Sequence, residues 1–92
     1  MRVANKSLRQ AIQSHVIRLL REERIRQRVS ITARATLAGL SQPLVSYVER
    51  ELRKPTLDTL LRLPEALGID LANVIRKATA AASRQKSGLN GQ

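Results

Sequence analysis

The chain has 92 residues, a length that fits one domain with a modest hydrophobic core and leaves no room for a separate catalytic or ligand-sensing domain. Seventeen Lys and Arg against seven Asp and Glu give a formal net charge of +10, which favours a polyanionic partner, nucleic acid first and an anionic membrane surface second. Cysteine is absent and His15 is the single histidine, so the composition excludes disulfides and thiolate metal sites, and we expect no metal and no cofactor. No signal-like or membrane-spanning apolar run occurs, so we expect a soluble cytoplasmic protein.

A long first helix is predicted over about residues 8–27. Ser7 and Gln10 have the spacing of a capping box, in which each side chain bonds the backbone N–H of the other residue. Apolar residues follow at helical spacing, namely Leu8, Ile12, Val16, Leu19 and Leu20.

Two short helices are predicted on either side of a tight turn. Ser30 can cap the second helix, and Gly39 supplies the left-handed residue that ends it. Ser41 can cap the third helix, in which Val45 and Val48 face inward. The apolar positions of the second helix are Ile31, Ala35 and Ala38. Small residues such as Ala35 let the two helices cross closely.

The rest of the chain predicts two further helices and a tail. Thr56 can cap a fourth helix that ends at Gly68, and Pro64 inside it predicts a kink between Leu60 and Pro64, because proline lacks an N–H and clashes with the preceding turn. Asp70 can cap a fifth helix. Residues 78–92 are predicted to be a fraying helix end and a disordered tail. No period-two alternation is present, so the fold class is all-α.

The segment from residue 30 onward resembles the Cro and cI-repressor-like helix-turn-helix family, also called the xenobiotic response element (XRE) family. The resemblance covers about residues 16–75 and is closest over residues 45–71. It implies a five-helix lambda-repressor-like DNA-binding domain over residues 8–77, with the helix-turn-helix at about 30–50 and an N-terminal arm at 1–7. The positions that match the family pattern without gaps are Gly39, Ser41, Gln42, Val45, Ser46, Glu49, Pro55, Leu60, Leu61, Ala66, Leu67 and Gly68.

Three residues depart from the family pattern. Arg34 stands where the family buries a leucine, so either Arg34 snorkels to solvent or Leu37 and Ile31 share that packing. Arg28 and Glu51 stand where many members have a glycine after a helix, and neither residue favours a left-handed backbone. We therefore expect both of those helices to end differently here.

The resemblance also implies a binding site, with Ser41–Glu49 as the recognition helix in the major groove. Gln42 would pair bidentately with adenine, and the other expected base contacts are Pro43, Ser46 and Tyr47. The expected phosphate contacts are Ser30, Ser41, Arg50, Arg53 and Lys54. The expected structural residues are the Arg24–Glu49 salt bridge together with Ala35, Gly39, Val45 and Val48.

Three functions are open at this point. The first is a sequence-specific regulator of transcription, a repressor or autoregulator that binds double-stranded DNA as a homodimer. The second is an antitoxin or similar module that binds a partner protein and uses the helix-turn-helix for autoregulation. The third is a nonspecific cationic binder of nucleic acid or membrane. We expect no enzyme, because a single histidine such as His15 is more often a surface or packed residue than a ligand or a proton shuttle.

Overall fold

The computed structural model describes the backbone of residues 7–90 and the side chains of residues 7–84. Within that range the chain forms five helices and no strands: α1 (Leu8–Arg26), α2 (Ile31–Ala38), α3 (Gln42–Glu49), α4 (Leu57–Ala66) and α5 (Leu71–Asn90). The predicted all-α fold with five helices is thus confirmed. None of these helices is both long enough and apolar enough to cross a membrane.

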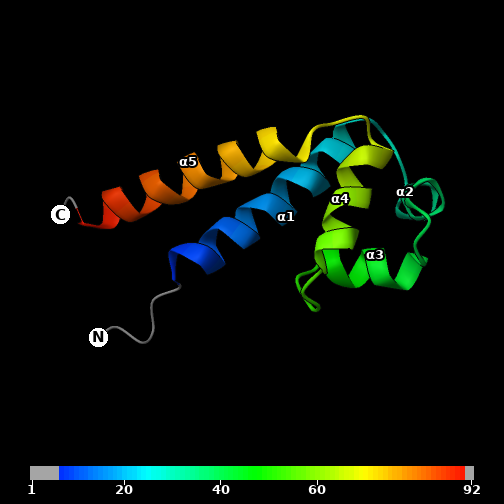
Figure 1. The fold of residues 1–92 in the computed structure, drawn as a ribbon, viewed down its shortest axis with the longest axis horizontal. Coiled ribbons are helices and arrows are strands. Elements are labelled where there is room, and N and C mark those ends of the chain that lie inside the picture. Colours follow the sequence, from blue (N-terminus) through cyan, green and yellow to red (C-terminus); the bar gives the residue numbers. More distant parts are fainter. Residues whose placement is uncertain (1–6, 91–92) are drawn as a thin grey trace.

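The two long helices, α1 and α5, lie side by side and antiparallel and form an arm that extends from the compact body of α2, α3 and α4 (Figure 1). The arm gives the molecule an elongated shape of 45 × 22 × 20 Å. Its interface is aliphatic, and the buried residues are Val16, Ile17 and Leu20 on α1 and Val74, Ala78 and Ala82 on α5. The α5 residues recur every four positions and so lie along one face of that helix.

The fifth helix corrects the prediction for residues 78–92. Ala78 and Ala82 are buried against α1 instead of fraying, and the helix continues to Asn90. The small alanine side chains allow the two helices to approach closely, which is why this stretch has a core face without any large apolar residue. Residues 91–92 of the predicted tail, and residues 1–6 of the predicted N-terminal arm, lie outside the described residues.

The predicted helix starts are confirmed by side-chain hydrogen bonds. Ser7 and Gln10 form the reciprocal capping box. The hydroxyl oxygens of Ser30, Ser41 and Thr56 accept hydrogen bonds from the backbone three residues later, at 3.0, 3.3 and 3.2 Å. The Asp70 carboxylate accepts from the N–H of Ala72 at 3.2 Å. Each cap satisfies an N–H that the first turn of a helix leaves unpaired.

The corners between helices use left-handed residues at four positions. Gly39 and Gly68 have φ of 69° and 71°, as a glycine after a helix allows. Arg28 and Glu51 have φ of 61° and 58°, so the expectation that these helices end differently is wrong. The chain adopts the family's left-handed corners with side chains that disfavour them, and the surrounding packing must offset the strain.

Proline 64 lies in the last turn of α4, which continues through it as one helix to Ala66. Its carbonyl oxygen accepts hydrogen bonds from Leu67 and Ile69 as the helix ends. The predicted kink stays a prediction, since a continuous helix can still bend at this position.

Candidate nucleic-acid interface

The third helix separates its residues between the core and the surface. Val45 and Val48 are fully buried, as predicted. Gln42 and Pro43 are exposed in the first turn, Tyr47 is 44% exposed, and Ser46 is intermediate. Proline is compatible with the first turn because the N–H it lacks would have no helical partner there. The four side chains that sequence analysis assigned to base contacts are therefore accessible, at least in part, on the surface of one short helix.

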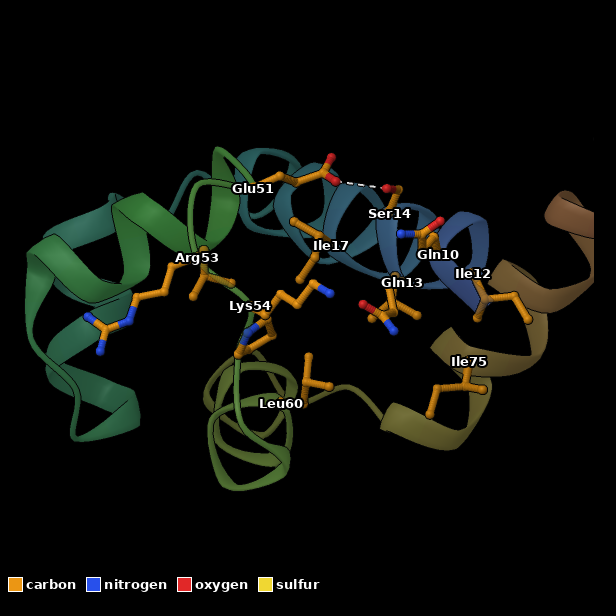
Figure 2. Close-up of a pocket in the computed structure, with 13 residues that line it drawn as sticks. Gln10, Ile12, Gln13, Ser14, Ile17, Glu51, Arg53, Lys54, Leu60 and Ile75 are labelled. Atoms are coloured by element: carbon orange, nitrogen blue, oxygen red, sulfur yellow. Dashed lines mark hydrogen bonds between the residues drawn. The ribbon is translucent and has the colours of Figure 1, made fainter. Parts of the chain in front are cut away.

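The basic residues that follow α3 lie on the surface. Arg50, Arg53 and Lys54 are exposed, and none of them forms an ion pair with any acid among the side chains described. The side chains of Arg53 and Lys54 point in opposite directions (Figure 2). Lys54 extends toward Gln13 across the groove that separates α1 from the connector between α3 and α4, and the side chain of Arg53 extends away from Gln13. Exposed cations without an acidic partner among the described side chains are accessible to a polyanion.

A groove of about 730 Å³ lies between α1 and the connector from α3 to α4. Its walls include apolar Ile12, Ile17, Leu60 and Ile75 as well as polar residues of both segments (Figure 2). The Ser14 hydroxyl donates a hydrogen bond to Glu51 Oε1 at 2.8 Å across one side of it. This bond ties the corner after α3 to the arm.

The predicted salt bridge between Arg24 and Glu49 is present and bidentate. Arg24 Nε donates to Glu49 Oε2 at 2.7 Å, and Arg24 Nη2 donates to Oε1 at 2.9 Å. The remaining terminal nitrogen donates to the carbonyl of Val29 at 2.8 Å. With side-chain exposures of 11% and 4%, the pair is largely withdrawn from water. It joins the end of α1 to Glu49, the last residue of α3.

Arg34 does not snorkel to solvent, and its own side chain occupies the buried position that Leu37 and Ile31 were expected to share. Its side chain is 0% exposed, and Nη1 donates to Glu49 Oε2 at 3.0 Å. Leu37 is 64% exposed, so of the two residues expected to share the packing only Ile31 lies against the core. Burial lowers the pKa of Arg34, and the nearby Glu49 carboxylate opposes that shift.

Sequence reasoning missed the partnership between Arg34 and Glu49, although a signal was present. Arg34 falls on the buried face of α2, in the i, i+3, i+4, i+7 spacing that also contains Ile31, Ala35 and Ala38. An arginine on such a face requires an acidic partner, and Glu49 was already expected to be partly buried.

Arg62 on α4 is a second residue that sequence reasoning did not single out. Its Nη1 donates to the carbonyl of Ala38 at 3.1 Å, and its Nε donates to Asp58 Oδ2 at 2.8 Å. A cation at the carboxyl end of α2 interacts favourably with the unpaired carbonyls and the helix dipole. The guanidinium also packs against the turn, since a Cβ on Gly39 would lie 2.9 Å from Nη1. The i, i+4 spacing of Asp58 and Arg62 was the available signal.

Comparison with known proteins agrees with this geometry. A family model for helix-turn-helix proteins, HTH_3, matches residues 20–73. The chain belongs to this family, the Cro/cI-type or XRE class of DNA-binding transcription regulators.

Among solved structures, the chain is similar to the clp gene regulator ClgR from Corynebacterium glutamicum, with a TM-score of 0.72 and 22% sequence identity. The match covers 86% of this chain and 84% of that one, and at this identity it establishes the shared fold. No curated protein is significantly similar in sequence.

Proposed function

We propose that this chain is a sequence-specific regulator of transcription that places α3 in the major groove of double-stranded DNA and acts as a repressor or autoregulator. The observation that carries the proposal is the division of α3 into two faces. Val45, Val48 and Glu49 hold one face to the protein, while Gln42, Pro43 and Tyr47 are free on the other. A helix anchored in this way can present side chains to base edges without moving.

Gln42 is the proposed specificity residue. Its amide can donate to N7 and accept from N6 of adenine at once, a pairing that no other base offers in the major groove. Pro43 would contact a thymine methyl group, and Ser46 and Tyr47 would complete the base contacts. These assignments use the exposure of the four side chains and the position of Gln42 in the first turn of α3.

Backbone contacts are assigned to the helix starts and to the basic residues after α3. The hydroxyl oxygens of Ser30 and Ser41 cap their own helices, so these residues would meet phosphates through the hydroxyl hydrogen and the free N–H groups of the first turn. Arg50, Arg53 and Lys54 would add charge. Phosphate contacts of this kind set the orientation of a protein on DNA and add affinity that is independent of sequence.

We further propose that the regulator works as a homodimer in the cytoplasm, on the nucleoid. An eight-residue helix such as α3 is about 12 Å long and therefore covers only about four base pairs. Two copies on half-sites about 34 Å apart would read twice as much sequence as one copy and would discriminate an operator better than a monomer. Sedimentation of the protein with and without operator DNA tests this state.

The test of the proposed function starts by selecting bound duplexes from random DNA with the wild-type protein. On the selected duplex, Gln42→Ala is expected to lose about 1–3 kcal/mol of binding free energy, and to lose little on unrelated sequences. Arg53→Ala is the matched control, expected to weaken binding to all sequences and to lower the slope of log K against log salt by about one.

Three results would count against the proposal. Equal losses by Gln42→Ala on every sequence would remove its role in base reading. Failure of the wild-type protein to enrich any sequence would favour a nonspecific cationic binder. A stoichiometric protein partner that blocks DNA binding would instead favour the antitoxin interpretation.

A further inference from the structure

The buried side chain of Arg34 connects three helices at the base of the recognition helix. It lies on α2 and donates from Nη1 to Glu49 Oε2 of α3 at 3.0 Å. The same nitrogen is 3.4 Å from the carbonyl oxygen of Leu20 on α1. Its exposure is 0%, so every one of these contacts is made away from water.

The electrostatics around Arg34 do not favour it as a source of stability. Arg24 and Arg34 share the single carboxylate of Glu49, and Nε of the partly exposed Arg21 lies 3.9 Å from Glu49 Oε1. The cluster therefore has an excess of positive charge. Nε and Nη2 of Arg34 are buried and have no hydrogen-bond partner in the part of the chain that the structure describes. An apolar side chain of similar size would fill the same space without desolvating a cation or two donors.

Arg34 constrains the orientation of the Glu49 carboxylate. Arg24 alone would hold the Glu49 carboxylate by one fork, about which the end of α3 could pivot. Arg34 approaches Oε2 from another helix, so three hydrogen bonds from two guanidiniums fix the carboxylate. Hydrogen bonds are directional and apolar contacts are not. Because Glu49 is the last residue of α3, fixing its carboxylate limits rotation of the helix that carries Gln42 and Tyr47.

We propose that Arg34 is a positioning residue for DNA recognition, which sets the orientation of α3 through Glu49 at the expense of stability. The part of this proposal that concerns DNA rests on the proposed function. The proposal also makes a claim about the free protein. Without Arg34, α3 opens and rotates more readily, and discrimination between DNA sequences falls even though the protein is equally stable or more so.

The experiment compares Arg34→Met with the wild-type chain, with Arg34→Leu as a second variant of different shape in case the first does not fold. Arg84→Met is the matched control for the loss of one positive charge, because Arg84 is exposed on the far half of α5. Three quantities are measured for each: the midpoint of unfolding in urea, hydrogen exchange of individual amides in free protein, and Kd on the selected duplex against single-base variants.

For Arg34→Met we expect an unchanged or higher unfolding midpoint, exchange of α3 amides about tenfold faster while α1 and α5 amides keep their rates, and about tenfold poorer discrimination between duplexes, comparable to the loss of one base contact. Affinity for unrelated DNA should change no more than in Arg84→Met. Unchanged α3 exchange would overturn the proposal, and so would unchanged discrimination by a selective protein or a uniform rise in exchange that follows a drop in global stability.

The two proposals fail in different ways. If the wild-type chain selects no DNA sequence, the proposed function is wrong, and the exchange of the α3 amides still decides whether Arg34 positions that helix. If the wild-type chain is selective and Arg34→Met is equally selective, only the positioning role is wrong.

Discussion

The arm formed by α1 and α5 and the body formed by α2, α3 and α4 are held together by different forces. The arm has an aliphatic interface in which Val74 and Ala78 of α5 belong to one buried cluster with Val16, Ile17 and Leu20 of α1. The body adds polar contacts that join specific atoms, from Arg34 to Glu49 and from Arg62 to the Ala38 carbonyl, and Arg24 at the end of α1 joins the arm to the same Glu49 carboxylate. Apolar burial is non-directional, so it stabilises without defining an orientation, whereas guanidinium contacts define one.

The difference matches the demands on each region. An arm needs close packing along its length, and it tolerates changes that preserve volume. The proposed function requires that α3 be held within a fraction of an ångström, which apolar contacts between side chains such as Ala35 and Val48 do not guarantee. The comparison predicts that loss of the Glu49 carboxylate, which both Arg24 and Arg34 contact, is the most costly change in the body, and that a change of volume is the most costly change in the arm.

The largest effect is expected for Glu49→Gln. This change keeps the shape of the side chain but removes the negative charge that pairs with Arg34 and Arg24. Arg34 has no contact with water and Arg24 has little, so both guanidiniums lose their compensating charge. Breaking a buried ion pair in this way costs about 3–5 kcal/mol of unfolding free energy, measured by urea denaturation. Glu51→Gln is the matched control, because Glu51 is exposed and its carboxylate bonds only to Ser14 among the contacts described. Equal losses in the two variants would show that the body has no special dependence on charge.

A smaller effect is expected for Ala78→Leu in the arm. Ala78 is fully buried between α5 and α1, so a leucine must separate the two helices or take a strained rotamer. Overpacking of this kind costs about 1–3 kcal/mol. Ala80→Leu on the exposed face of the same helix should be nearly neutral. If both variants are equally stable by thermal unfolding, the arm is looser than its burial indicates.

The smallest effect is expected for Arg28→Gly at the corner after α1. Arg28 has a φ of 61°, a conformation that glycine adopts without strain. Relief of the strain exceeds the entropic cost of the extra freedom of glycine in the unfolded chain. We therefore expect the free energy of unfolding to rise by up to about 1 kcal/mol. Arg50→Gly, at a φ of −89°, should lower stability instead. A loss at residue 28 as large as that at residue 50 would mean that its left-handed backbone is not strained.

Local patterns were enough to predict the helix starts and the faces of α3. Ser7, Ser30, Ser41 and Thr56 cap their helices as expected, because a cap is formed by residues within one turn of each other. The Arg24–Glu49 pair was available only through the family resemblance, since the two residues are 25 positions apart. The contacts of Gln42 and its neighbours with DNA stay predictions.

The sequence by itself thus determined the five helices, their starts and their order, which depend on spacing along the chain. The tertiary structure decided three things that spacing could not. It buried Arg34 on Glu49, it gave the alanines of α5 a partner in α1, and it imposed left-handed corners on Arg28 and Glu51. Each depends on which distant segment fills the adjacent space, and the packing of the whole molecule can offset a local cost that the residue alone would avoid.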